Sequence, residues 1–84
     1  MPESPIRLDE LDETDVRIVK ALVEAGKALR PREIAERIGE DGRRVAAKMR
    51  KLVRLGLVKR VGDGVYEATE KAKEIASAHA EATA

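Results

Sequence analysis

The chain has 84 residues, a net charge of +1 and no cysteine. This length suits one small domain with a modest aliphatic core, since the chain has one Tyr and neither Phe nor Trp. The composition excludes disulfides, thiolate metal sites and cysteine nucleophiles, and it leaves little room for an enclosed small-molecule pocket. No stretch is apolar for long enough to predict a membrane span, so we expect a cytoplasmic protein, associated with the nucleoid if the source is prokaryotic.

The positive charge is concentrated in one block of the chain. Residues 43–60 contain eight Lys and Arg residues and no Asp or Glu, although 39% of all residues are charged. A local field of one sign attracts a polyanion, so the block predicts a nucleic-acid partner; an ordinary solvated helix face is the alternative. The absence of Asn and Gln in so charged a chain favours a thermophile as the source.

The first elements are marked by prolines and helix caps. Residues 1–10 contain two prolines and no clear period, which predicts an extended N-terminal arm. Asp12 is a good N-cap for a helix over 13–25, which Gly26 ends. A short extended connector at 28–30 follows, because a residue before proline is disfavoured in the helical region.

Two helices separated by a tight turn come next. Pro31 opens a helix that ends at Gly39, and Asp41 caps a third helix over 41–55 that Gly56 ends. Two consecutive helices joined by so short a turn are typical of a helix-turn-helix.

The period then changes to that of strands. Residues 57–61 and 65–68 are two β-prone runs joined by Gly62-Asp63-Gly64, which predicts a β-hairpin. Thr69 is a candidate cap for a last helix. We therefore expect one domain over residues 11–80 and a frayed end at 81–84.

The third helix has two faces. Four residues are expected to face the interior: Val45, Met49, Leu52 and Val53. Six are expected to face solvent: Arg43, Arg44, Ala47, Lys48, Lys51 and Arg54. Arg50 and Arg54 are each as suited to pairing with an acid, or to covering apolar surface, as to contacting DNA.

The predicted fold is mainly α with a small β-hairpin, and this order of elements resembles a winged helix-turn-helix. Residues 11–22 resemble the start of the DNA-binding domain of the leucine-responsive (Lrp/AsnC) regulators. Residues 52–60 and 66–72 resemble the wing region of winged-helix regulators that include the MarR group. The resemblance implies a three-helix core with a wing and a C-terminal helix, and a DNA-binding function in transcriptional regulation.

The resemblance also implies how DNA would be bound. Helix 41–55 would lie in the major groove, with basic residues on the phosphates. The candidate DNA-binding residues are Arg43, Arg44, Ala47, Lys48, Lys51, Arg54, Lys59 and Arg60. Without Asn or Gln, base readout depends on Arg or Lys with guanine, or on DNA shape. Asp63 at the wing tip argues against insertion of the wing into the minor groove.

Other partners and functions follow from the same residues. We expect a homodimer formed through the first and last helices, no cofactor, no metal and no small-molecule effector. We expect no enzyme, because the chain lacks a nucleophile–histidine pairing, a carboxylate pair with a base, and a glycine-rich phosphate loop. The alternatives are a winged-helix protein-interaction module of a larger transcription or replication complex, and a low-specificity architectural binder of DNA or RNA.

Overall fold

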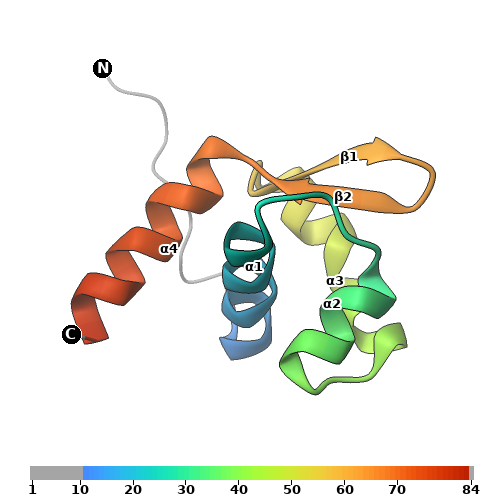
Figure 1. The fold of residues 1–84 in the computed structure, drawn as a ribbon, viewed down its shortest axis with the longest axis horizontal. Coiled ribbons are helices and arrows are strands. Elements are labelled where there is room, and N and C mark those ends of the chain that lie inside the picture. The colour runs from blue at the N-terminus through green and yellow to red at the C-terminus, as the bar shows by residue number, and fades with distance from the viewer. Residues whose placement is uncertain (1–10, 84) are drawn as a thin grey trace.

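The computed structural model describes residues 11–83; the predicted arm at 1–10 and Ala84 lie outside them. The fold is mostly helical with one antiparallel hairpin, as predicted. Its elements in chain order are α1 (Glu13–Ala25), α2 (Pro31–Ile38), α3 (Gly42–Arg54), β1 (Val58–Gly62), β2 (Val65–Ala68) and α4 (Glu70–Thr83). Figure 1 shows α1, α2 and α3 packed beneath the hairpin, with α4 extending away from them.

Helix α1 begins and ends where its caps predict. The Asp12 carboxylate accepts the Asp15 backbone N–H at 2.8 Å, and the Asp15 carboxylate accepts the Asp12 N–H at 3.0 Å. These reciprocal bonds satisfy backbone donors that the first helical turn leaves unpaired. Gly26 then adopts a left-handed conformation with φ of 66°, which favours glycine and ends the helix.

Helix α3 lies within one residue of its predicted bounds at each end. The Asp41 carboxylate accepts the Arg43 N–H at 2.8 Å and caps the helix. Val45, Met49 and Leu52 are fully buried, as expected. Val53 was expected to face the interior, but it is 40% exposed. The buried face of α3 is therefore narrower than the sequence predicted.

The hairpin is joined to the helical core by a third extended segment. Leu29, in the connector between α1 and α2, exchanges two backbone hydrogen bonds with Tyr66 of β2, at 2.7 and 2.9 Å. The predicted extended connector is thus confirmed. Within the hairpin, Lys59 pairs with Glu67 and Arg60 with Tyr66, and the register shifts between Arg60 and Gly62. This register decides which hairpin side chains face α3.

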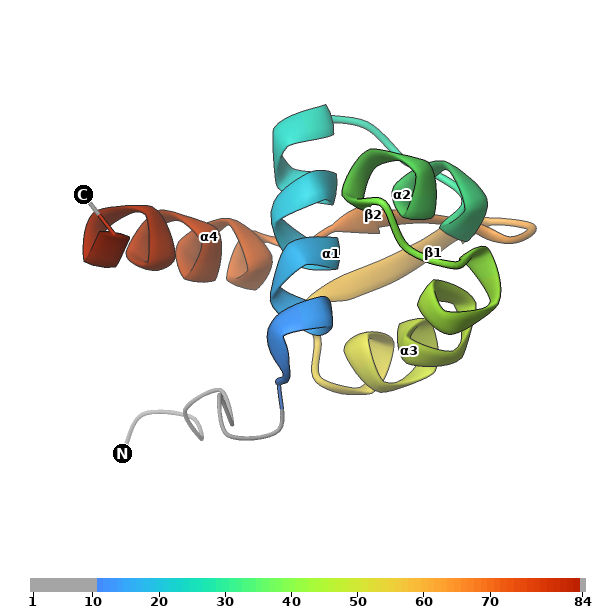
Figure 2. The ribbon, with the colours of Figure 1, turned by 90° about the horizontal axis from the view of Figure 1, so that it is seen from below.

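Helix α4 packs on α1 and leaves α3 uncovered. In Figures 1 and 2, α4 lies on the opposite side of α1 from α2 and α3. The Thr69 hydroxyl donates to the Gly56 carbonyl at 2.6 Å and accepts the Ala72 N–H at 3.4 Å, so Thr69 caps the helix as predicted. Ala72 and Ile75 are buried in the core. The helix continues to Thr83, beyond the predicted end near residue 80.

The core is aliphatic and gathers side chains from every helix and from the hairpin. Its largest buried members are Ile18, Leu22, Ile34, Met49, Leu52 and Leu57. Burial of these side chains is the largest contribution that holds α3 on the rest of the domain. Among residues 11–83, no helix is long and apolar enough to cross a membrane.

Candidate nucleic-acid interface

The exposed face of α3 is built around arginines and alanines. Because each helical residue turns by about 100°, burial of Val45, Met49 and Leu52 directs the opposite face to solvent. The exposed residues of α3 are Arg43, Arg44, Ala46, Ala47, Arg50, Val53 and Arg54. Within the described part of the chain, Arg43, Arg44 and Arg50 form no ion pair. These three guanidiniums are available to an outside ligand.

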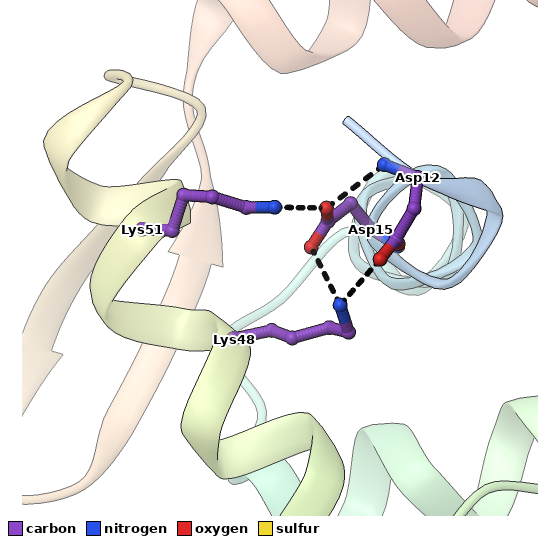
Figure 3. A network of polar contacts seen from close by, with 4 residues as sticks. All are labelled: Asp12, Asp15, Lys48 and Lys51. Atoms are coloured by element: carbon purple, nitrogen blue, oxygen red, sulfur yellow. Dashed lines mark hydrogen bonds and ion pairs between the residues drawn. The ribbon is translucent and has the colours of Figure 1, made fainter. Parts of the chain in front are cut away.

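Two lysines expected on that face point elsewhere. Lys48 and Lys51 turn toward the start of α1, as Figure 3 shows. The Lys51 ammonium lies 2.5 Å from the Asp15 carboxylate, and the Lys48 ammonium lies 2.6 Å from that of Asp12. Their side chains are 28% and 18% exposed. The prediction that Lys48 and Lys51 face solvent is therefore wrong.

The reason is the buried carboxylate of Asp15. Asp15 is fully buried, and a charge removed from water is very unfavourable unless opposite charge or hydrogen bonds stabilise it. Lys51 supplies the close ion pair, and the Lys48 ammonium lies 3.9 Å from the other Asp15 oxygen. That second oxygen, Oδ1, has no hydrogen-bond partner among the described residues, so it depends on the nearby Lys48 charge. The two lysines thus tie α3 to α1.

The same cluster perturbs Asp12. The Lys48 ammonium, which donates a hydrogen bond to Asp12, holds the pKa of that carboxyl well below its ordinary value, and the Asp15 N–H acts in the same direction. Partial burial opposes this shift but is the weaker influence. Asp12 therefore stays ionised in acid that would protonate an isolated aspartate.

The sequence held a signal for this cluster. Asp15 stands three residues before Ile18 and seven before Leu22, on the apolar stripe of α1. An acid on a buried stripe requires a cation from a neighbouring element. The largest excess of cations lies in residues 43–60, which contain eight Lys and Arg residues and no acid.

The two hairpin cations lie on opposite faces of the hairpin. Lys59 pairs with Glu67 at 3.8 Å, and Glu67 lines a hollow beside α1. Arg60 pairs with Asp63 at 3.2 Å and, with Tyr66, lines an open groove against α3. Only Arg60 of the two therefore joins the exposed face of α3. The sequence analysis had grouped the two together; alternation along a strand places neighbours on opposite faces, but only the packing of the hairpin decides which face lies toward α3.

The structure thus divides the eight predicted residues into three groups. Arg43, Arg44, Ala47 and Arg54 lie on the exposed face of α3, and Arg60 lies beside it. Lys48 and Lys51 belong to the contact with α1, and Lys59 to the other hairpin face. Arg50, which the sequence left open between three roles, lies on the exposed face. Among the described residues, no group of His, Cys, Asp or Glu is arranged to hold a metal ion.

Comparison with known families agrees with this arrangement. A family model described as winged helix-turn-helix DNA-binding matches residues 11–59, from the start of α1 into β1. A search of curated proteins finds no match to the chain. The matched segment covers more than half of the chain and contains all three core helices, including the exposed arginines of α3. The chain therefore belongs to the winged helix-turn-helix DNA-binding family.

Proposed function

We propose that the protein is a small transcriptional regulator that binds double-stranded DNA with α3 in the major groove. The observation that supports this most directly is the set of exposed guanidiniums on α3, those of Arg43, Arg44 and Arg50, which form no ion pair within the described residues. Arginine presents a planar fork of donors that fits guanine edges and phosphate oxygens.

The shape of this face also suits a groove. Ala46 and Ala47 are exposed and small, so the helix axis can approach the base pairs closely. Arg43 and Arg44 lie in the first turn of α3, the end that commonly points at base edges in this motif. Arg50 lies two turns further along and is placed for a backbone phosphate. The expected readout is therefore of guanines and DNA shape.

We further propose a binding role without catalysis, and a homodimer formed through α1 and α4. Helix α4 lies on the opposite side of α1 from α3, so a contact through it would leave both recognition helices open. Two half-sites would add binding energy that one small interface lacks. Sedimentation velocity at micromolar concentration measures this; a monomer at all concentrations would refute the dimer.

The test is binding to a random-sequence duplex at several salt concentrations. For the wild type, log affinity should fall linearly with log salt, with a slope of about −0.9 for each phosphate neutralised. The Arg43→Ala and Arg50→Ala variants should each weaken binding by roughly fivefold or more. The matched control is Lys27→Ala, which removes one positive charge from the exposed turn after α1, and it should change affinity by less than about twofold.

One observation favours a second candidate, a protein-interaction module. Both hairpin cations pair with acids, and Val61 on the hairpin is 47% exposed, so the hairpin presents little net charge and some apolar surface. This candidate predicts a folded protein that does not bind duplex DNA even at low salt. The same titration therefore separates the two.

A further inference from the structure

An open groove runs between the exposed face of α3 and the hairpin. Ala46, Arg50 and Val53 line it from α3, and Arg60 and Tyr66 line it from the hairpin. Figure 1 shows the two elements that form it, with the C-terminal turns of α3 beneath the hairpin. Cationic side chains thus come from both walls, while the small Ala46 side chain leaves space between them.

The chemistry of the groove suits an oxyanion. Two guanidiniums on opposite walls can each donate a pair of hydrogen bonds to oxygens held between them. The Val53 methyl groups and the Tyr66 side chain replace water along part of the walls, which strengthens the attraction between opposite charges. Among the described residues, no carboxylate lines the groove.

In the structure, the Arg60 guanidinium contacts two groups of the adjoining hairpin loop. Its Nη2 lies 3.2 Å from Asp63 Oδ1, and its Nε donates to the Gly62 carbonyl at 3.1 Å. The Asp63 side chain is fully exposed and that of Arg60 is 59% exposed. Exposed ion pairs of this kind are weak and exchange readily for another anion. Asp63 therefore holds Arg60 only loosely.

We propose that this groove holds one phosphate of the DNA backbone between Arg50 and Arg60, and that Asp63 competes with that phosphate for Arg60. The inference rests on the proposed function and specifies one contact within it. When DNA binds, the Arg60 guanidinium exchanges the Asp63 carboxylate for a phosphodiester oxygen. The displaced carboxylate then lies near a charge of its own sign, which lowers the affinity for DNA.

The decisive variant is Asp63→Asn, which removes the competing charge and keeps the size of the side chain. Duplex affinity should rise by roughly two- to fivefold at low salt, the range expected for one exposed pair. The slope of log affinity against log salt should steepen by up to about 0.9 as Arg60 becomes fully available. Fluorescence anisotropy with a labelled random duplex measures both, and circular dichroism confirms the fold.

The matched control is Glu67→Gln, which makes the same change of charge on the other face of the hairpin, where Glu67 pairs with Lys59. It should raise affinity less than Asp63→Asn does. The Arg60→Ala background completes the test: there, Asp63→Asn should give no more than the gain from Glu67→Gln. Such coupling assigns the effect to Arg60 and not to net charge.

The outcomes separate this inference from the proposed function. If Arg43→Ala weakens binding but Asp63→Asn and Glu67→Gln raise the affinity equally, the proposed phosphate site between Arg50 and Arg60 is wrong and the proposed function stands. If Asp63→Asn raises duplex affinity equally in the wild-type and Arg60→Ala backgrounds, the proposed phosphate site is also wrong. If the folded wild type ignores duplex DNA at low salt, both proposals are wrong.

Discussion

The two sides of α3 both carry positive charge, but they differ in exposure and in ion pairing. On the side that faces α1, Lys48 and Lys51 are partly buried and paired with Asp12 and Asp15. On the open side, Arg43 and Arg50 are exposed and form no ion pair within the described residues. The compact lysine ammonium suits a tight contact with carboxylates, whereas the arginine fork suits nucleic acid. The cations of one basic helix thus differ in their partners: some are held by acids of the same chain, and others remain exposed.

This division changes how the charge of the chain is interpreted. Of the eight cations in residues 43–60, at least four pair with acids of the same chain: Lys48, Lys51, Lys59 and Arg60. The field available to DNA is therefore smaller than the sequence count indicates. Arg43, Arg44 and Arg50 remain on the exposed face of α3 without an ion pair among the described residues.

The largest expected effect comes from removing the positive charges on the α1 side of α3. The double variant Lys48→Ala/Lys51→Ala leaves the Asp15 carboxylate buried without a counter-charge, so we expect the free energy of unfolding to fall by about 2–4 kcal/mol. Urea denaturation followed by circular dichroism measures this. If so small a domain unfolds entirely, the single Lys51→Ala variant gives a milder loss in the same direction.

The matched control is Arg43→Ala/Arg50→Ala, which removes two positive charges from the other side of the same helix. Stability should change by no more than about 0.5 kcal/mol, because these side chains are exposed. Equal losses of stability in the two double variants would show that the sides do not differ.

Local signals in the sequence were enough to locate the elements. Asp12, Pro31, Gly26 and Gly39 act on residues within one turn, so the helix bounds follow directly from the chain. The orientation of Lys48 depends on a carboxylate 36 residues away, and it becomes known only when α1 packs on α3. Helix bounds were therefore predictable, whereas the division of cations within α3 required tertiary contacts.

The contact between α1 and α3 should also make stability depend on pH. Asp12 has a pKa below its unfolded value, so it contributes stability that is present above about pH 4 and is lost as the pH falls further. The Asp12→Asn variant keeps a good N-cap but cannot titrate. Its stability should therefore fall less steeply than that of the wild type between about pH 5 and pH 2.

The cause of that shift can be tested separately. The hydrogen bond from Lys48 is the largest influence on the pKa of Asp12. In the Lys48→Ala variant, the free energy of unfolding should therefore also fall less steeply as the pH is lowered. Chemical denaturation at each pH measures the slope. An Asp12→Asn curve parallel to that of the wild type would contradict the role of this carboxylate.

The smallest expected effect on stability and DNA binding comes from Lys59 in the hairpin. Lys59 and its neighbour Arg60 lie on opposite faces of the hairpin. Lys59 is 61% exposed and pairs with Glu67 across the hairpin, on the face away from α3. Lys59→Ala should change stability by less than about 0.5 kcal/mol, since exposed pairs contribute little. It should also weaken duplex binding by less than about twofold, and less than Arg60→Ala does, although each variant removes one positive charge. Anisotropy titrations of the two variants on one duplex test this directly. If Lys59→Ala weakens binding more, the hairpin meets DNA with its other face, and the groove beside α3 is not part of the interface.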